Sequence, residues 1–322
     1  MRTVAFFNHK GGVGKTTLLF NTAVVLSQMG RRVVLLDADA QANLTALALP
    51  EARVLAAIEQ HRTIWDVVSP VVTGAGDLRM VAPEQIRDTL WILPGDIRIS
   101  NFEAIAPVGW TEALAGEARG FRVTSAMHRV LQALASEVNA DLALIDLGPN
   151  VNALNRSVLI STDGFVVPLA PDLFSVMALP SVGQSIKTWI TQWKTALGNK
   201  PADLELSLPE GLPKPLGYLS QQFSTYRKSP TTAFQQWLDK IPDAYTDGIL
   251  RPLANAGVPI PAGDHSLRSL KNYGALVPTA QEGNKALFEL DGREAYGSQY
   301  TKAQESRELF QAVAETILAK LG

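Results

Sequence analysis

Short apolar runs without alternation recur along the chain, and each is followed by a turn signal and a helical pattern. The runs cover residues 4–7, 33–36, 90–93, 142–145, 165–169, 216–219 and 258–260. Near-continuous apolarity is typical of strands covered on both faces, and the intervening helices would supply that cover. The pattern therefore predicts an α/β fold with a doubly wound, mostly parallel sheet flanked by helices.

Two helical patterns stand out at the ends of the chain. Apolar residues at helical spacing predict a helix from Lys15 to about Met29, with Gly30 placed to end it. Residues 305–321 carry a second apolar stripe, which predicts a helix that docks on the body of the protein. The polar face of this second helix is not rich in Lys and Arg, which disfavours a membrane-surface role.

The stretch 198–217 is rich in proline, with Pro201, Pro209, Pro213 and Pro215. Prolines disfavour regular structure, so a long connection is predicted here. Because strand-like runs continue after it, we interpret the stretch as an insertion within a single domain over residues 1–322 rather than as a domain boundary.

The composition is that of a packed globular protein, with 46% hydrophobic and 19% charged residues. A formal charge of -2 provides no bulk attraction for nucleic acid or anionic lipid, so any such binding must come from a local patch. The absence of cysteine excludes disulfides, thiolate metal sites and iron–sulfur clusters. Neither a secretion signal nor a spanning apolar stretch is visible, so we expect a cytoplasmic protein.

A glycine-rich loop lies between the first predicted strand and the first predicted helix. Its nucleotide-binding residues would be Gly11, Gly12, Val13, Gly14, Lys15, Thr16 and Thr17. Glycines let successive backbone N–H groups converge on an anion, and the helix N-terminus adds its positive dipole end. Lys15 would neutralise the β and γ oxygens of ATP, and the Thr16 hydroxyl would bind Mg²⁺. The sequence therefore predicts a P-loop NTPase fold.

Carboxylates follow two of the predicted strands. Asp146 ends the run 142–145, which fits the Walker B role, and Asp37 and Asp39 follow the run 33–36. The carboxyl ends of strands are where open sheets place their ligands. An aspartate in such a place can also be a helix cap or a turn residue, but the glycine loop and the carboxylates reinforce one another.

The chain resembles the ParA/MinD/Soj family of deviant Walker A ATPases over most of its length. "KGGVGKTT" at 10–17, "DADAQANLT" at 37–45 and "LALIDLGPN" at 142–150 are similar to its loop, its "DxDPQxNxT" segment and its Walker B and switch region. Residues 166–179 and 258–274 stand where that family has strand-to-loop segments. The resemblance is closest to ParA-type partition or positioning ATPases, and with the loop beginning at residue 10 we expect no N-terminal helix-turn-helix.

The resemblance implies roles for individual residues. Lys10 would reach across an ATP-sandwiched homodimer to the phosphates of the other subunit, and Asp39 would orient the attacking water. Asp37 and Asp146 would support magnesium through water, and Gly148 would be a switch residue that senses the γ-phosphate. Gly148 and Ala40 stand where the family has prolines.

The resemblance also implies a function: a dimeric switch with slow, partner-stimulated ATP hydrolysis that positions or segregates DNA or another cargo. Its partners would be nonspecific DNA and a ParB-like or cargo-adaptor protein, and it would be nucleoid-associated. Arg227, Lys228, Arg268 and Lys271 are candidate DNA contacts, with ordinary surface charge as the alternative.

Two other functions stay open. One is a membrane-associated ATPase similar to MinD, which the C-terminal helix disfavours. The other is a P-loop ligase or synthetase acting on a small carboxylic acid. Lys10 and the segment 37–45 favour the positioning switch over the ligase.

Overall fold

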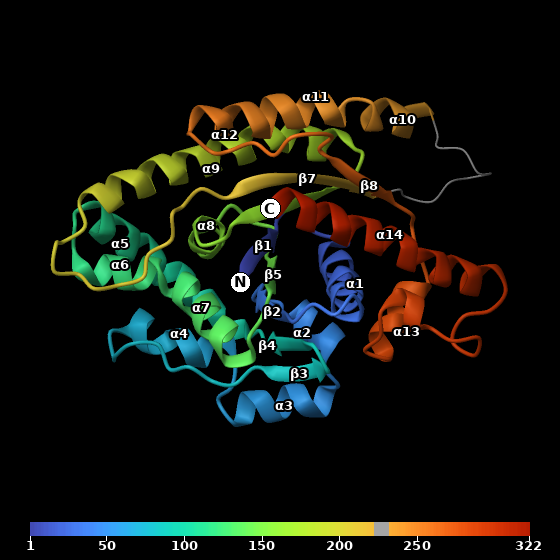
Figure 1. The fold of residues 1–322 in the computed structure, drawn as a ribbon, viewed down its shortest axis with the longest axis horizontal. Helices are drawn as coiled ribbons and strands as arrows, with labels where there is room; N and C mark the ends of the chain where they lie inside the picture. The colour runs from blue at the N-terminus through green and yellow to red at the C-terminus, as the bar shows by residue number, and fades with distance from the viewer. Residues whose placement is uncertain (222–231) are drawn as a thin grey trace.

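An eight-stranded sheet forms the centre of the computed structural model, which describes residues 1–221 and 232–322 (Figure 1). The strands are β1 (Arg2–Phe6), β2 (Val33–Ala38), β3 (Glu84–Arg87), β4 (Leu90–Leu93), β5 (Leu142–Leu147), β6 (Gly164–Leu169), β7 (Lys214–Gln221) and β8 (Ser266–Leu270). Their order is β3-β4-β2-β5-β1-β6-β7-β8. All neighbouring pairs are parallel except β3 with β4. The prediction of a doubly wound, mostly parallel sheet is confirmed.

Helices cover both faces of the sheet (Figure 1). One face carries α1 (Lys15–Gln28), α13 (Leu276–Glu282) and α14 (Ser298–Leu321). The other carries α4 (Ile64–Thr73), α5 (Phe102–Leu114), α6 (Ala118–Thr124), α7 (Ala126–Val138), α8 (Ala153–Ile160) and α9 (Leu173–Gly198). The other helical segments of the described residues are α2 (Asn43–Ala48), α3 (Glu51–Glu59), η1 (Ile97–Asn101), α10 (Thr232–Leu238), α11 (Ile241–Tyr245), η3 (Thr246–Leu250), α12 (Arg251–Asn255) and η4 (Leu287–Glu289).

The sequence patterns located both terminal helices. The first predicted helix is α1, and the C-terminal one is α14, which begins at Ser298 rather than at residue 305. Phe310, Val313 and Ile317 of α14 are buried, so it docks as expected. Among the described helices, none combines the length and the apolarity needed to cross a bilayer.

One predicted strand is absent from the structure, and two observed strands were not predicted. The run 258–260 is not a strand, because Pro259 and Pro261 cannot donate the hydrogen bonds of a sheet ladder. The last parallel strand is instead β8, whose mixed polar and apolar residues suit a sheet edge. β3 is likewise a polar strand at the opposite edge, and apolar runs do not reveal either one.

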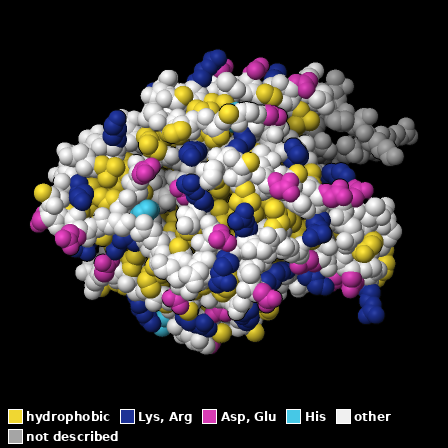
Figure 2. All heavy atoms as spheres, in the orientation of Figure 1, with side chains coloured by type: hydrophobic (Ala, Val, Ile, Leu, Met, Phe, Trp, Pro, Cys, Tyr) yellow, Lys and Arg dark blue, Asp and Glu magenta, His cyan; other side chains and the backbone are white. Residues whose placement is uncertain are grey.

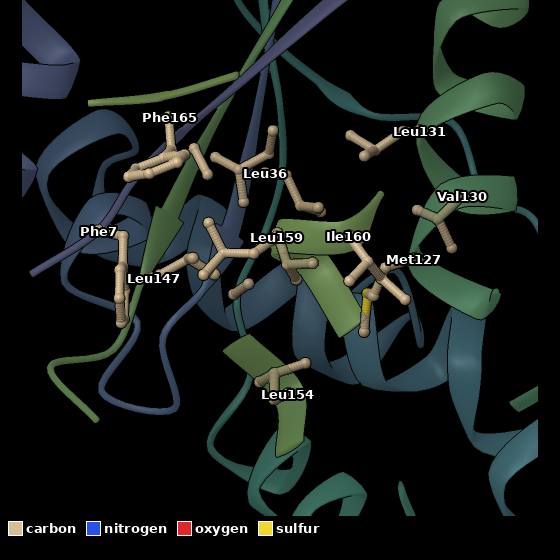
Figure 3. Packing of buried hydrophobic residues seen from close by; sticks show 14 of the residues in the cluster. Phe7, Leu36, Met127, Val130, Leu131, Leu147, Leu154, Leu159, Ile160 and Phe165 are labelled. Atoms are coloured by element: carbon tan, nitrogen blue, oxygen red, sulfur yellow. The ribbon is translucent and has the colours of Figure 1, made fainter. Parts of the chain in front are cut away.

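The core between the sheet and helices α7 and α8 holds the ends of the central strands in place. Phe7, Leu36, Leu147 and Phe165 of the sheet side belong to one buried cluster with Met127 and other apolar side chains of these helices (Figure 3). Each such buried side chain contributes about 1.5–3 kcal/mol relative to an exposed one. The loops at the carboxyl ends of β1, β2, β5 and β6 therefore start from fixed positions.

Residues 199–213 connect α9 to β7 and contain no helix or strand, as predicted for most of the stretch 198–217. The ends of that stretch differ, because Gly198 belongs to α9 and residues 214–217, with Pro215, belong to β7. The connection is anchored by Trp193, whose indole Nε1 donates to the carbonyl of Pro209 at 2.9 Å. That residues 1–322 form a single domain stays a prediction.

Helix α9 crosses η3 at a contact between two glycines. A Cβ atom added to Gly183 would lie 1.8 Å from the carbonyl oxygen of Gly248, far inside van der Waals contact. The two backbones therefore approach more closely than any side chain allows.

This crossing gives a stability prediction. Gly183→Ala should lower the free energy of unfolding by about 1–3 kcal/mol, because the backbones must separate to admit the methyl group. Gly198→Ala, at the end of the same helix, meets no atom within 4 Å and should be neutral or stabilising by up to about 1 kcal/mol. The urea concentrations at half-unfolding of both variants measure these changes in stability. Equal midpoints would contradict the packing argument.

Candidate nucleotide-binding site

The loop between β1 and α1 has the backbone of an anion cradle. Gly12 and Gly14 have φ angles of 75° and 66°, a left-handed region that glycine adopts without strain. The first hydrogen bond of α1 runs from Leu18 N–H to the Gly14 carbonyl at 2.9 Å. The amides of Lys15, Thr16 and Thr17 therefore have no carbonyl partner within the helix and can receive an anion.

Lys15, Thr16 and Asp146 meet at the carboxyl end of β5. Lys15 Nζ lies 3.0 Å from Asp146 Oδ1, and the Thr16 hydroxyl donates to Asp146 Oδ2 at 2.6 Å. The Asp146 side chain has no exposed surface, and that of Lys15 is 10% exposed. Burial raises the pKa of Asp146, while Lys15 and Thr16 oppose that rise by stabilising the carboxylate.

Asp37 lies beside Asp146, because the parallel register of β2 and β5 pairs these two residues. Its Oδ2 accepts from both the backbone N–H and the hydroxyl of Thr45, each at 2.7 Å. The same hydroxyl accepts from the backbone N–H of Gly95 at 2.7 Å. Burial, and next the negative charge of Asp146, raise the pKa of Asp37 to about 7 despite the bonds from Thr45.

Asp39 and Gly148 face each other across the site. A Cβ at Gly148 would lie 3.5 Å from Asp39 Oδ1, an ordinary contact distance, and Gly148 is not in the left-handed region. Neither the backbone nor the space therefore demands glycine here. The Gly148 carbonyl accepts from Asn155 Nδ2 at 2.8 Å, which ties the segment to α8. The γ-phosphate-sensing role of Gly148 stays a prediction.

Lys10 is paired within its own chain. Its Nζ lies 2.5 Å from Asp172 Oδ2, and the two side chains are 41% and 32% exposed. Partial burial alone would raise the pKa of Asp172, but the bonds from Lys10 and from the backbone of Ser175 hold it below its usual value. The role of Lys10 across a subunit boundary stays a prediction.

A cavity of about 190 Å³ adjoins the glycine loop on the side of β8. It is lined by Gly12, Gly14, Thr17, Leu18, Leu270, Lys271, Asn272, Tyr273, Val277 and Phe310. Apolar and aromatic walls next to a phosphate cradle suit the base and sugar of a nucleotide.

The oxygen atoms at the site match the chemistry of magnesium. Thr16, Asp37 and Asp146 offer hydroxyl and carboxylate oxygens, the hard ligands that this ion prefers. Within residues 1–221 and 232–322, no three His, Asp or Glu side chains are arranged to enclose a metal. Magnesium in nucleotide sites usually takes most of its ligands from phosphate oxygens and water, and it would do so here.

The structure describes two of the four predicted DNA-contact residues. Arg227 and Lys228 lie outside the described residues. Arg268 is exposed on β8, and Lys271 forms an ion pair with Glu305 at 2.8 Å beside the cavity. On the face that Figure 2 shows, Lys and Arg are interspersed with Asp and Glu. DNA binding thus stays a prediction.

Sequence reasoning missed several residues that shape the site. Thr45 holds Asp37, Asn155 holds the segment at Gly148, and Asp172 holds Lys10. Thr45 ends the family-like segment 37–45, so its position offered a signal. Asp172 lies within the family-like segment 166–179, but its distant partner Lys10 gave no sign of the contact. Asn155 offered no signal, because its partners are backbone atoms.

Comparisons with known proteins agree with this geometry. A family model described as "AAA domain" matches residues 1–198. The chain is 29% identical over 191 residues to the chromosome partitioning protein ParA of Caulobacter vibrioides, a match that covers 58% of this chain and 62% of that protein. The matched part thus spans less than two thirds of this relative.

Solved structures show the same fold. Protein DIP2308 from Corynebacterium diphtheriae superposes with a TM-score of 0.71 at 25% identity, covering 88% of this chain and 97% of that one. A plasmid partition protein from Borrelia burgdorferi, bound to AMPPNP, superposes with a TM-score of 0.60 at 16% identity, covering 96% and 98%. The predicted P-loop fold is confirmed.

The raised pKa of Asp37 gives a pH prediction for the protein without nucleotide. As pH rises from about 4 to about 7, the unfolded chain loses this proton first, so Asp37 destabilises the fold progressively over that interval. Asp37→Asn should therefore gain stability relative to the wild type between about pH 5 and about pH 7.5. Urea unfolding at both pH values measures the difference in free energy of unfolding between variant and wild type. Asp203→Asn, which removes an exposed carboxylate, is the control. A difference independent of pH would contradict the assignment.

Proposed function

This chain belongs to the AAA domain family together with ParA-type partition ATPases, and we propose that it is an ATP-dependent dimeric switch that positions or segregates DNA or another cargo. The observation that carries the proposal is the convergence of Lys15, Thr16 and Asp146 at a glycine loop that opens a helix. The family relationship supports a positioning ATPase. What we propose beyond it is that the chain dimerises, that it binds DNA and how it hydrolyses ATP.

ATP would bind with its phosphates on the amides of the loop. Lys15 can turn from Asp146 toward the β and γ oxygens, since only an ion pair and no covalent constraint holds it. Thr16 would then give its hydroxyl oxygen to magnesium, with Asp146 and Asp37 behind its water ligands. The ion supplies charge neutralisation at the phosphates when bound.

Asp39 would orient the attacking water. It follows β2, is 7% exposed, and its Oδ1 accepts from the backbone N–H of Gln41 at 3.0 Å, which fixes the carboxylate. A fixed carboxylate at the phosphate edge can hold a water in line for attack. Gly148 faces it and would report the presence of the γ-phosphate.

Lys10 would complete the site of a second subunit. A cation supplied across a dimer interface stabilises negative charge on the transferring phosphoryl group, as an arginine finger does. Hydrolysis would be slow until a ParB-like or cargo-adaptor protein stimulates it. The protein would act in the cytoplasm on nonspecific DNA of the nucleoid.

The two lysines of the loop should separate ATP binding from dimerisation. Lys15→Ala should weaken ATP binding at least about tenfold, because a charge-assisted contact to phosphate is lost. Lys10→Ala should bind ATP as the wild type does but stay monomeric and inactive. Titration with a fluorescent ATP analogue and sedimentation with ATP and Mg²⁺ measure the two effects, with circular dichroism as the folding control. Normal ATP-dependent dimers of Lys10→Ala would remove Lys10 from the interface.

Nonspecific DNA binding should depend on the basic residues near β8. The double variant Arg268→Gln, Lys271→Gln should weaken ATP-dependent binding to DNA of any sequence. The slope of the logarithm of the binding constant against the logarithm of the salt concentration should become shallower by about 2, one for each lost phosphate contact. The matched control removes two exposed charges elsewhere, Arg31→Gln with Arg251→Gln. Fluorescence anisotropy of labelled DNA across a salt series measures the affinity of each double variant and its salt dependence. Equal losses in the two double variants would contradict a local DNA surface.

A further inference from the structure

Two buried carboxylates outside the nucleotide site are bridged by Arg98. Asp66 and Asp96 are 7% and 5% exposed. The Nε atom of Arg98 lies 2.9 and 3.0 Å from the two oxygens of Asp96, and its Nη2 lies 3.3 Å from Asp66 Oδ1. The Thr63 hydroxyl lies 2.7 Å from Oδ2 of both carboxylates, and with one hydrogen it can donate to only one of them. We refer to Thr63, Asp66, Asp96 and Arg98 as the Arg98 cluster.

The Arg98 cluster fixes residues 94–96, the segment that follows β4. Asp96 belongs to the cluster, and its Oδ1 also accepts from the backbone N–H of Arg98 at 2.8 Å. At the other end of the segment, the carbonyl of Pro94 accepts from the backbone N–H of Ile64 at 2.9 Å. Ile64 is the first residue of α4 and directly follows Thr63. The outer side of this short segment is therefore held at both ends.

Gly95, in the middle of the segment, lies against the carboxylate of Asp37. Its N–H donates to the Thr45 hydroxyl, which donates to Asp37 Oδ2. Because the N–H of Gly95 occupies one lone pair of this hydroxyl, the hydroxyl hydrogen points away from Gly95 and toward Asp37. No side chain fits between the two residues, since a Cβ added to Gly95 would lie 2.9 Å from Asp37 Oδ2. The position of the segment therefore decides how Asp37 is held.

We propose that the Arg98 cluster positions Asp37 for magnesium, through Gly95 and Thr45, and thereby sets the Mg²⁺ concentration that the protein needs to bind ATP. Arg98 is a positioning residue in this proposal, because it acts on Asp37 only through other residues. The proposal rests on the proposed function, because it requires that Mg²⁺ and ATP bind beside Asp37.

The chemistry of the cluster favours positioning over stability alone. Buried ion pairs often add little net stability, because the cost of removing the charges from water offsets their attraction. An arginine that binds a carboxylate through its planar fork does, however, impose one geometry on it. The segment fixed in this way is the one in contact with Asp37. An outward shift of that segment would lengthen the bond from Gly95 to Thr45 and free the hydroxyl to rotate.

The proposal is tested with Arg98→Gln and Asp96→Asn, which remove the two sides of one ion pair. Either change should raise the Mg²⁺ concentration for half-maximal binding of a fluorescent ATP analogue by about three- to tenfold, and leave binding in EDTA unchanged. This is less than the roughly 10–100-fold typical of a residue that holds a metal ligand directly. The matched control is Arg119→Gln, which breaks a similar pair with Glu112 between α6 and α5 and should not change the Mg²⁺ requirement.

The double variant shows whether Arg98 acts through Asp96. Arg98→Gln combined with Asp96→Asn should need no more Mg²⁺ than the more affected single variant, because both changes remove the same contact. Additive effects would overturn the proposed route. Circular dichroism and urea unfolding monitor the fold of each variant. Asparagine keeps the size of Asp96 and an acceptor for the backbone N–H of Arg98, so Asp96→Asn carries the test if Arg98→Gln does not fold.

The outcomes separate this proposal from the function on which it rests. If the wild type binds the analogue no better with Mg²⁺ than in EDTA, the proposed use of magnesium with ATP is wrong, and this proposal with it. If the wild type needs Mg²⁺ and the two single variants need no more than the wild type, only the role of the Arg98 cluster is wrong. Equal losses of binding with Mg²⁺ and in EDTA would also overturn that role, because a general loss of structure does not distinguish the two conditions.

Discussion

The buried charge of Asp146 is the constraint on which the site depends. A carboxylate with no exposed surface is tolerated only when cations and donors compensate it, and leaving it unpaired would cost several kcal/mol. Lys15 and Thr16 provide that compensation from the first residues of α1. The start of this helix, the conformation of the glycine loop and the end of β5 are therefore coupled through one ion pair and one hydrogen bond.

The register of the sheet adds a second carboxylate at the same point. Asp37 stands next to Asp146 on the neighbouring strand, and burial together with the negative charge of Asp146 opposes the ionisation of Asp37. Thr45 and Gly95 surround Asp37 so closely that a Cβ at Gly95 would lie 2.8 Å from the Asp37 carboxyl carbon. A magnesium ion at this edge would relieve the repulsion, so the two carboxylates would gain from its positive charge. Binding would in this way be coupled to the segments that carry Thr45 and Gly148.

Local patterns in the sequence were sufficient for much of this arrangement. Continuous apolar runs located the central strands, and the glycine loop with its two lysines located the phosphate site, because both depend on neighbouring residues. The edge strands β3 and β8 were missed because a strand with one free edge carries polar residues. The apolar run 258–260 is not a strand, because prolines in and next to it cannot donate to a sheet ladder. The contact of Gly95 with Thr45 and that of Asp172 with Lys10 could not be predicted, since they arise only through the order of strands in the folded sheet.

The account depends on a site that two subunits complete, and the dependence of turnover on protein concentration tests this most directly. ATP hydrolysis per subunit should be measured with saturating ATP and Mg²⁺ over concentrations on both sides of the dimer dissociation constant found by sedimentation. The account predicts that hydrolysis per subunit rises with concentration and levels off when the dimer is fully formed. Constant hydrolysis per subunit across the same range would show that one chain is sufficient and would contradict it.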